Sequence, residues 1–356
     1  MTAQKVSKRT TIRDVARLAG VSPSTVSQVL RGHKGYASRE TTERILAAVE
    51  ELGYRPNAVA QSLVTARTRT IGLIISSIIG PLFPQVLSGI EQEARQQEYS
   101  VLLICARDIE QERAAVQIFR DKRVDAVIFM TTSREQPDLA FISQMASEGY
   151  PIVVINRALG DPAIHEIVWD DLAIGRIATE HLIGLGHSRI AHVAGTLGPT
   201  GYSYRAAVER LAGYREALAN AELAMDERLL IEAGHSSARG FEATNHLLKL
   251  AEPPTAIFAV DDTVAVGVMN ALQRARYRVP QEISVVGAGG AYDELQTEPP
   301  LTTVYMPIKE AGRRAARHVI GAIDGHESAV PHREVLAPEL RIHGSTGVPP
   351  DVWSHH

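Results

Sequence analysis

The first feature of the chain that suggests chemistry is a short run of hydroxyl and amide side chains near its start. The run begins at Pro23, contains two valines, and includes Ser24, Thr25, Ser27 and Gln28. On a helix these polar groups lie opposite the valines. Side chains of this size let a helix enter the major groove of DNA, where they hydrogen-bond to base edges and phosphates. The run therefore predicts a helix that contacts duplex DNA.

The preceding residues predict a first helix that meets this one at a tight turn. Thr11 and Asp14 have the spacing of a capping box, which marks a helix start. Gly20 suits the turn, and Ser22 can cap the second helix, which runs to about residue 30. The small residue Ala16 leaves room for two helices to cross. Together these features have the logic of a helix-turn-helix.

A third helix is predicted between Ser38 and Gly53. Helices this short are unstable by themselves, so we expect all three to share one small core. The apolar side chains available for that core are Ile12, Val15, Ala16, Val21, Val26 and Val29. Residues 1–55 are thus predicted to form an all-α head.

The charge of the chain is distributed unevenly. Residues 1–70 contain twelve lysines and arginines but only five acidic residues, a net charge of +7. Because the whole chain carries −4, the remaining residues carry −11. A basic head on an acidic body indicates a polyanionic partner for the head alone.

Residues 56–69 are predicted to be a hinge and linker. A helix that starts near Asn57 has room for only two turns before residue 65, so it should need a partner to become ordered. Leu63 on such a hinge can wedge into the minor groove and kink the duplex. The alternative is an ordinary linker whose Leu63 packs on the core.

From residue 70 onward, short β-branched runs alternate with amphipathic stretches. This rhythm predicts parallel sheets with helices on both faces, and its length favours two α/β lobes. The predicted strands cover residues 70–75, 101–104, 126–129, 152–155, 190–193, 256–260 and 283–286. The predicted helices cover residues 84–97, 173–185, 207–219, 240–250 and 263–275. The Gly- and Pro-rich end of the chain is predicted to be a loose tail.

Composition and missing motifs narrow the function classes. The only cysteine, Cys105, lies in an apolar run and is predicted to be a small core residue. No run of about 18 apolar residues and no secretory signal is present, so we expect a cytoplasmic protein without membrane contact. An enzyme is disfavoured because there is no phosphate loop, metal-ligand pair or nucleophile elbow, and no cofactor is expected. A transport binding protein would need a signal peptide and no basic head.

The motifs of the chain resemble those of the lactose repressor/galactose repressor family. The start TIRDVARLAGVS stands at residues 11–22, STVS at 24–27, and the hinge pattern GYRPNAVAQSL at 53–63. Further matches include TIGLI from residue 70, RLAGY from residue 210 and ISVVG from residue 283. The resemblance covers roughly residues 10–345.

This resemblance implies a dimeric transcription regulator whose heads bind the half-sites of a near-palindromic operator in double-stranded DNA. It implies a repressor more than an activator, and a dimer because the tail lacks leucine heptads. Pro23, Ser24 and Gln28 would face bases, and Leu63 would be the minor-groove wedge. The full set of DNA-binding positions carried over is Thr11, Ser22, Pro23, Ser24, Thr25, Ser27, Gln28, Asn57 and Leu63.

The family's core resembles periplasmic sugar-binding proteins and closes over a small effector. We therefore expect a core over residues 70–345 and a flexible tail over 346–356. Lobe 1 would take residues 70–169 and 302–328, and lobe 2 would take 170–301 and 329–345. Effector-binding candidates by motif are Leu82, Phe83, Asp170, Arg210, His235 and Asp261. The alternative for two of them is that Arg210 and Asp170 pair with each other across the lobes.

Three departures from the family pattern bear on specificity. Gln28 stands where the family usually has Arg, and since Gln pairs with adenine and Arg with guanine, we expect an altered operator. Gly289 replaces an acidic residue that often holds a sugar hydroxyl, and Gly80 to Phe83 lacks a first aromatic platform. The longer loop after residue 194 can bring Tyr202, Tyr204 and Arg205 to the cleft. A sugar or sugar derivative is the first expectation, and a bulkier or non-sugar ligand the alternative.

Overall fold

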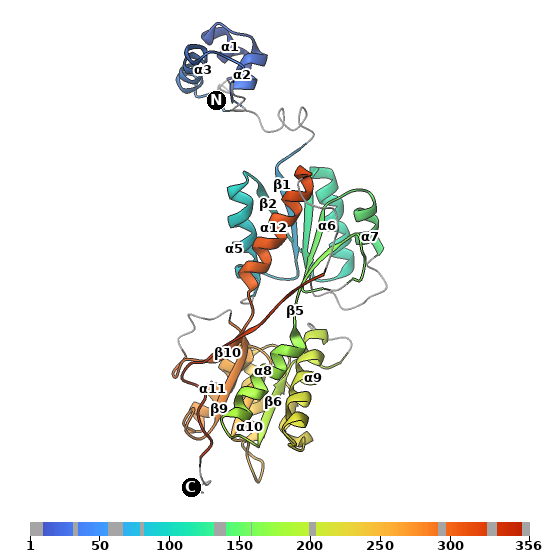
Figure 1. Ribbon diagram of the computed structural model, residues 1–356, viewed down its shortest axis with the longest axis vertical. Helices are drawn as coiled ribbons and strands as arrows, with labels where there is room; N and C mark the ends of the chain where they lie inside the picture. Colours follow the sequence, from blue (N-terminus) through green and yellow to red (C-terminus); the bar gives the residue numbers. More distant parts are fainter. Residues whose placement is uncertain are drawn as a thin grey trace, which may run out of the picture. The chain divides into compact units, whose positions relative to one another are not determined.

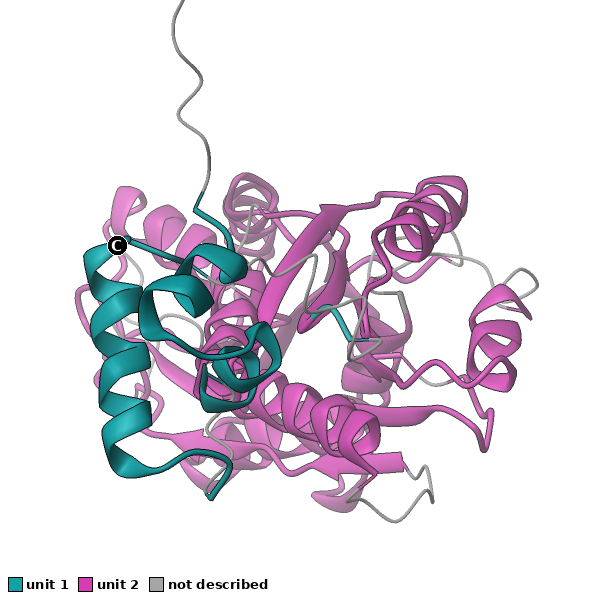
Figure 2. Ribbon diagram, turned by 90° about the horizontal axis from the view of Figure 1, so that it is seen from above, with its two compact units in different colours: residues 1–68 teal, residues 69–356 magenta. Residues whose placement is uncertain are grey.

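The computed structural model describes residues 10–30, 35–55, 67–78, 82–131, 140–157, 159–198, 204–290, 297–325 and 333–350. The chain divides into two compact units between Thr68 and Arg69 (Figure 2). None of the described helices is long and apolar enough to cross a membrane.

The first unit contains the three helices that the sequence predicts. Helix α1 (Ile12–Ala19) ends at Gly20, whose φ of 65° turns the chain into α2 (Pro23–Leu30). Helix α3 (Arg39–Glu51) is capped by Ser38, whose hydroxyl accepts a hydrogen bond from Thr41 N. The three share one core, with Ile12, Val21 and Val29 packed at its edge, and its buried members are Val15, Ala16, Ala19, Val26, Ile45 and Ala48.

The second unit contains two six-stranded sheets (Figure 1). The first sheet is entirely parallel and has the order β11-β5-β4-β3-β1-β2. Its strands are β1 (Thr70–Ile75), β2 (Ser100–Cys105), β3 (Ala126–Met130), β4 (Ile152–Ile155), β5 (His165–Trp169) and β11 (Arg333–Leu336). The central strands are nearly continuous apolar runs because helices cover both faces of the sheet.

The second sheet has the order β12-β10-β9-β8-β6-β7, and only β12 is antiparallel to its neighbour. Its strands are β6 (Ile190–Ala194), β7 (Leu230–Glu232), β8 (Ala256–Ala259), β9 (Ser284–Gly289), β10 (Thr302–Tyr305) and β12 (Glu339–Arg341). We call the first sheet with its helices lobe 1 and the second sheet with its helices lobe 2. The two-lobed parallel α/β fold is the predicted one.

Each sheet is covered by one layer of helices on each of its two faces. In lobe 1, α5 (Leu82–Gln96) and α12 (Ile308–Asp324) pack on one face, while α6 (Ile109–Lys122) and α7 (Ala140–Ser147) pack on the other. In lobe 2, α8 (Asp171–Gly184) and α9 (Tyr204–Asn220) lie opposite α10 (Ser237–Leu247) and α11 (Asp262–Arg274). A short 3-10 helix, η1 (Glu227–Leu229), precedes β7.

The chain crosses between the lobes three times, after β5, after β10 and between β11 and β12. Strands β5 and β10 therefore both end at the junction of the lobes. Because the other strands of each sheet, apart from β12, run parallel to these two, the carboxyl ends of both sheets face this junction. Loops at carboxyl ends of parallel strands are where open α/β sheets bind ligands.

Two crossing points differ from the expected lobe boundaries. Residues 302–305 were assigned to lobe 1, but β10 pairs with β9 in lobe 2, with Thr302 opposite Val286. Residues 329–345 were assigned to lobe 2, but β11 pairs with β5 in lobe 1. The second and third crossings thus come one strand later than expected. The reason is that β10 and β11 are four-residue strands with polar members, which give little apolar signal.

The end of the core was also mispredicted. Residues 346–350 were expected to be a flexible tail, yet the packing seen at fully buried Ser345, whose hydroxyl donates to the Val285 carbonyl at 2.6 Å, continues past it. The Gly347 carbonyl accepts from His187, which is 2% exposed, at 2.9 Å. The described part of the tail therefore closes lobe 2 as a packed segment. Cys105, expected in the core, is exposed at the end of edge strand β2.

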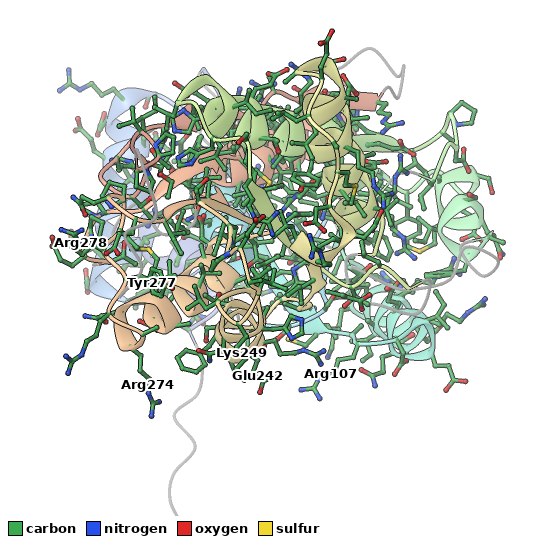
Figure 3. The ribbon with its side chains drawn as sticks, turned by 90° about the horizontal axis from the view of Figure 1, so that it is seen from below. Arg107, Glu242, Lys249, Arg274, Tyr277 and Arg278 are labelled. Atoms are coloured by element: carbon green, nitrogen blue, oxygen red, sulfur yellow. The ribbon has the colours of Figure 1, made fainter. Side chains whose placement is uncertain are left out.

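Charged side chains behave differently at the two ends of lobe 2. At the outer ends of α10 and α11, Lys249 and Arg274 are exposed and extend away from the ribbon (Figure 3). Arg278 is 73% exposed there and pairs with nearby Glu282. At the junction end, by contrast, Arg210, Asp171 and Asp262 are buried.

Candidate DNA-binding surface and effector site

The start of α2 is organised by hydroxyl groups. Ser22 Oγ accepts a hydrogen bond from Thr25 N at 3.1 Å and lies 2.6 and 2.8 Å from the hydroxyl oxygens of Ser24 and Thr25. Ser22, Pro23 and Ser24 are exposed, whereas Val26 on the opposite side of the helix is fully buried. The structure therefore holds the polar face of α2 outward by packing its apolar face into the core.

Two further predicted contact residues are placed by their neighbours. Gln28 is half-buried on the last turn of α2. The carboxylate of Asp14 accepts hydrogen bonds from the backbone and hydroxyl of Thr11 at 3.0 and 2.7 Å, and it pairs with Arg17 at 2.6 Å. These contacts fix the start of α1. The predicted contacts Asn57 and Leu63 lie outside the described residues.

Arg210 on α9 joins both crossing segments at the lobe junction. Its side chain is 7% exposed, and it donates to Asp171 at 2.9 Å, to the Val260 carbonyl at 2.6 Å and to Met306 Sδ at 3.3 Å. Asp171 opens α8, where the chain enters lobe 2, and Met306 follows β10, where it leaves. Burial raises the pKa of Asp171, while the adjacent Arg210 lowers it.

Two aspartate pairs mark the helices that leave the junction. In each pair the first residue caps the helix: Asp170 accepts from Ala173 N and Asp261 accepts from Val264 N, both at 2.9 Å. The second residue of each pair, Asp171 or Asp262, is buried. The alternative that Arg210 pairs with Asp170 is therefore wrong, because its partner is the neighbouring Asp171.

Asp262 brings a carboxylate to the end of β9. It accepts hydrogen bonds from Gly290 N at 2.7 Å and from the Thr303 hydroxyl at 2.6 Å. Burial raises the pKa of this carboxyl to about 6, against the effect of these two donors. Gly287 makes the approach possible, because a Cβ there would press on the Asp262 carboxylate. The carboxylate at this end of the sheet therefore comes from Asp262 at the start of α11, and it binds the backbone of Gly290.

His235 and Asp261 form a second polar contact at the carboxyl ends of lobe 2. His235 Nδ1 lies 2.6 Å from Asp261 Oδ2, and the two side chains are 20% and 22% exposed. Gly195, which follows β6, lies directly against the imidazole, since a Cβ there would meet the ring. The structure therefore brings Arg210, His235 and Asp261 to the same end of one sheet.

The remaining predicted effector residues differ in how far they are buried. Phe83 is 5% exposed and packs in the core of lobe 1, and Leu82 beside it is half-buried at the start of α5. Asp170 is exposed. Tyr202 and the side chain of Tyr204 lie outside the described residues, and Arg205 pairs with Glu209 at 2.8 Å on the surface of α9.

Two buried donors of lobe 1 were not among the predicted site residues, although Trp169 adjoins the predicted Asp170. Arg157 follows β4 and donates to Glu112 at 3.2 Å and to the Thr131 hydroxyl at 2.9 Å, with its side chain 9% exposed. Burial lowers the pKa of Arg157, opposed by Glu112. Trp169 ends β5, and its buried indole nitrogen has no hydrogen-bond partner among the described residues. The only sequence feature that could have indicated them is their position at the carboxyl ends of apolar runs.

Metal chemistry has no visible site in the described ranges, where no group of three His, Cys, Asp or Glu side chains could hold an ion.

Two family descriptions match the chain. Residues 11–57 match bacterial regulatory proteins of the lacI family, and residues 68–342 match periplasmic binding proteins and the sugar binding domain of the LacI family. The HTH-type transcriptional repressor PurR of Vibrio atlanticus is 34% identical over 310 residues, which are 86% of this chain and 89% of that protein. The HTH-type transcriptional regulator DegA of Bacillus subtilis is 33% identical over 341 residues, 95% and 98% of the two chains.

Solved structures agree with this assignment. A structure of the Lac repressor dimer bound to operator and the anti-inducer ONPF matches with a TM-score of 0.82 and 30% identity, covering 96% of this chain and 100% of that one. A complex of the transcriptional regulator CelR with cellobiose matches with a TM-score of 0.67 and 32% identity, covering 95% and 100%. A helix-turn-helix head followed by a two-sheet parallel core, matched over nearly its whole length, places this chain in the lacI family of bacterial regulatory proteins.

Proposed function

We propose that this protein is a transcriptional repressor that binds a near-palindromic operator as a homodimer, and that a small molecule between its lobes changes its grip on DNA. One observation carries the proposal: a single chain joins a helix-turn-helix head to a two-sheet core whose strand ends meet at one junction. The relatives support it, since one is a Lac repressor dimer on its operator and another is a regulator complexed with cellobiose.

In the head, α2 is the element that enters the major groove. Pro23, Ser24 and Gln28 contact bases, and the hydroxyls of Ser22, Thr25 and Ser27 bind phosphates or bases. Thr11, at the start of α1, contacts a phosphate of the DNA backbone, because the free N–H groups at the start of a helix bind phosphate well. Asn57 and Leu63 complete the set through the hinge. The net charge of +7 on residues 1–70 supplies the sequence-independent part of the affinity.

In the core, the effector lies at the junction. Asp170, Arg210, His235 and Asp261 line its lobe 2 side, and Leu82 and Phe83 its lobe 1 side. Arg157 and Trp169 join the proposal because both place buried donors at the carboxyl ends of adjacent strands. We propose that a ligand that bridges the lobes acts through the contacts of Arg210 with Asp171 and Met306, because these two residues lie on segments that connect the lobes.

The effector is proposed to be a sugar or a sugar derivative. A neutral sugar presents hydroxyl groups that both donate and accept hydrogen bonds, and the charged pairs of the junction offer both kinds of partner. At the end of β9, the space beside Gly287 and Gly290 is filled by Asp262 and Tyr305, so Asp262 is the polar side chain that this end offers. The proposal includes no enzymatic activity and no cofactor, and it places the protein in the cytoplasm.

A two-step binding experiment tests this proposal. The full chain is melted with each member of a panel of sugars, sugar phosphates and other small metabolites. Compounds that raise the melting temperature are then added to the protein on a duplex that it selects from a randomised library. We expect at least one compound to change the DNA affinity by about 5- to 150-fold, the usual range of allosteric coupling. A compound that raises the melting temperature but leaves the DNA affinity unaltered would remove the switch.

A further inference from the structure

The chain leaves lobe 1 for the DNA-binding unit at Arg69, and this residue is fixed to the end of α5. Its backbone N–H donates to Asp125 at 2.7 Å. Its guanidinium donates to the Gln97 carbonyl at 3.3 Å and to Glu98 at 3.0 Å, just beyond the last residue of α5. Arg69 is therefore tied both to the segment that follows α5 and, through Asp125, to the start of β3.

Helices α5 and α12 touch backbone to backbone. A Cβ at Gly89 of α5 would overlap the Lys309 carbonyl of α12, and a Cβ at Gly312 of α12 would overlap the Val86 carbonyl of α5. The contact is thus reciprocal and leaves no room for a methyl group on either helix. Close-packed interiors transmit displacement rather than absorb it.

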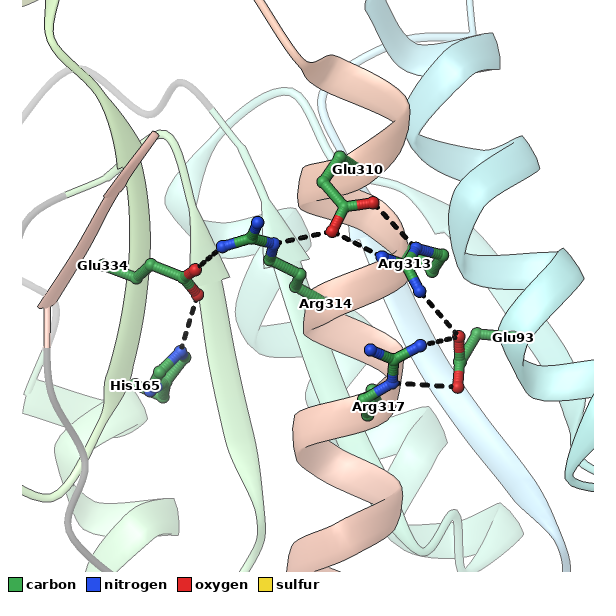
Figure 4. Close-up of polar contacts among 7 residues, drawn as sticks. All are labelled: Glu93, His165, Glu310, Arg313, Arg314, Arg317 and Glu334. Atoms are coloured by element: carbon green, nitrogen blue, oxygen red, sulfur yellow. Dashed lines mark hydrogen bonds and ion pairs between the residues drawn. The ribbon is translucent and has the colours of Figure 1, made fainter. Parts of the chain in front are cut away.

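A buried carboxylate locks this helix pair. Glu93 on α5 is 5% exposed, and it accepts two hydrogen bonds from Arg317 on α12, at 2.9 and 3.2 Å (Figure 4). Arg313, one turn earlier on α12, lies 4.0 Å from the same carboxylate. Paired hydrogen bonds from one guanidinium fix orientation as well as distance. Sliding of the two helices would break them.

The other end of α12 begins at the lobe junction. Ile308 is its first residue, two positions after Met306, whose sulfur accepts the hydrogen bond from Arg210 of lobe 2. Farther along the helix, Glu310 pairs with Arg313 and Arg314, and Arg314 also pairs with Glu334 of β11 (Figure 4). α12 is therefore held to the crossing strand β11 as well as to α5.

We propose that α5 and α12 move as one body that carries the position of lobe 2 to Arg69, and that Glu93 is the positioning residue that joins the two helices. The inference rests on the proposed function, because it explains how a ligand at the junction alters DNA binding. By linkage the coupling is reciprocal, so bound DNA must in turn alter the junction. DNA alone can therefore test it without knowledge of the effector.

Hydrogen exchange of the full chain, with and without a duplex that the chain selects from a randomised library, measures this coupling. The matched variants are Glu93→Gln and Glu91→Gln, since Glu91 lies on the same helix but is 51% exposed and, among the described residues, pairs with Arg95 alone, at 3.4 Å. In the wild type and in Glu91→Gln, we expect bound duplex to slow exchange at residues 306–312 by about fivefold or more. In Glu93→Gln the head remains protected by the duplex, but the slowing at 306–312 is lost.

Arg317→Gln removes the same contact by changing an exposed side chain, and it must likewise lose the slowing at 306–312. This second variant keeps the test valid if Glu93→Gln fails to melt cooperatively. Equal slowing in the wild type and in both contact-breaking variants would overturn the inference, as would a wild type in which the duplex leaves 306–312 unchanged. A chain that enriches no duplex at all would instead contradict the proposed function.

Discussion

The guanidinium of Arg210 and the carboxylate of Asp171 lie 2.8 Å apart, with 7% and 8% of their side chains exposed. They come from α9 and α8, and Arg210 also reaches the segment that leads out of lobe 2. A buried charge is costly unless it is paired and hydrogen-bonded, so each residue depends on the other for its place in the fold.

Removal of one partner should therefore destabilise the core. Asp171→Asn leaves the guanidinium of Arg210 buried without its counter-charge, and breaking a buried pair this way costs about 3–5 kcal/mol. Urea unfolding at pH 7 measures the change. The control is Glu209→Gln, which removes a surface pair with Arg205 and should cost about 0.5 kcal/mol or less. Similar losses in the two variants would contradict the role assigned to the buried pair.

The helix contact in lobe 1 predicts a strong effect of one methyl group. Gly312→Ala places a Cβ against the Val86 carbonyl, so α12 must shift and the free energy of unfolding should fall by about 1–3 kcal/mol. Gly184→Ala, at the end of α8, adds the same methyl group in open space and should be neutral or stabilising by up to about 1 kcal/mol. Thermal unfolding of both variants distinguishes the effect of the close helix contact from the effect of replacing any helical glycine by alanine.

Acid sensitivity is expected from a buried histidine. His192 on β6 is fully buried against Phe258, and burial lowers its pKa to about 4. The unfolded chain binds a proton at this residue from about pH 6.5 downward, whereas the folded chain does not until about pH 4. Its contribution to stability is thus complete above pH 6.5 and falls by about 3 kcal/mol as the pH drops to 4. His192→Phe should remove this part of the acid loss in urea titrations. An unchanged pH profile would contradict it.

Asp262 should have the opposite pH dependence. Its folded pKa of about 6 lies above the value near 4 of an unfolded aspartate, so the folded chain holds the proton more tightly. Stability from this group is therefore lost as the pH rises from about 4 to 6, by about 2–3 kcal/mol. Asp262→Asn should remove that loss and leave a profile dominated by the histidines. If the stability of Asp262→Asn varied with pH as the wild type does, the carboxyl would have to be ionised throughout.

The head and most core strands could be predicted because their signals are local. Gly20, Ser22 and Ser38 mark helix ends by conformation and hydrogen bonding, and strand β1 is one apolar run. Strands β10 and β11 gave no such signal, since Thr302 and Thr303 are buried by pairing with distant strands rather than by their own character. The lobe boundaries therefore moved when the structure supplied the pairing.

The effector site shows where local reasoning ends. Asp170 and Asp261 were singled out, but each caps a helix, while the next residue, Asp171 or Asp262, is the one that buries its charge. The starts of α8 and α11 differ from the predicted ones by one or two residues, and that shift decides which carboxylate points inward. Arg157 was missed because its partner Glu112 is 45 positions away.

The base preference of the head is predicted to depend on Gln28. Glutamine pairs best with adenine through two hydrogen bonds, and arginine with guanine. Selection from a library with one randomised half-site should therefore enrich adenine at the contacted position for the wild type and guanine for Gln28→Arg. Each such pair contributes about 1–3 kcal/mol of discrimination. Gln28→Ala is the control, and it should lose the adenine preference without gaining another. The same base enriched by all three proteins would rule out a contact from this residue.

Sequence recognition by the head is tested most directly by the affinity of the full chain for a selected duplex, compared with a scrambled duplex at the same salt concentration. We expect selection to enrich near-palindromic sites, and we expect these sites to bind about 10³-fold or more tightly than scrambled DNA. We also expect Ser24→Ala and Gln28→Ala to reduce this ratio, and Lys249→Ala, at an exposed residue just after α10, to leave it unchanged. Equal affinity for selected and scrambled duplexes would contradict the claim that this head reads sequence.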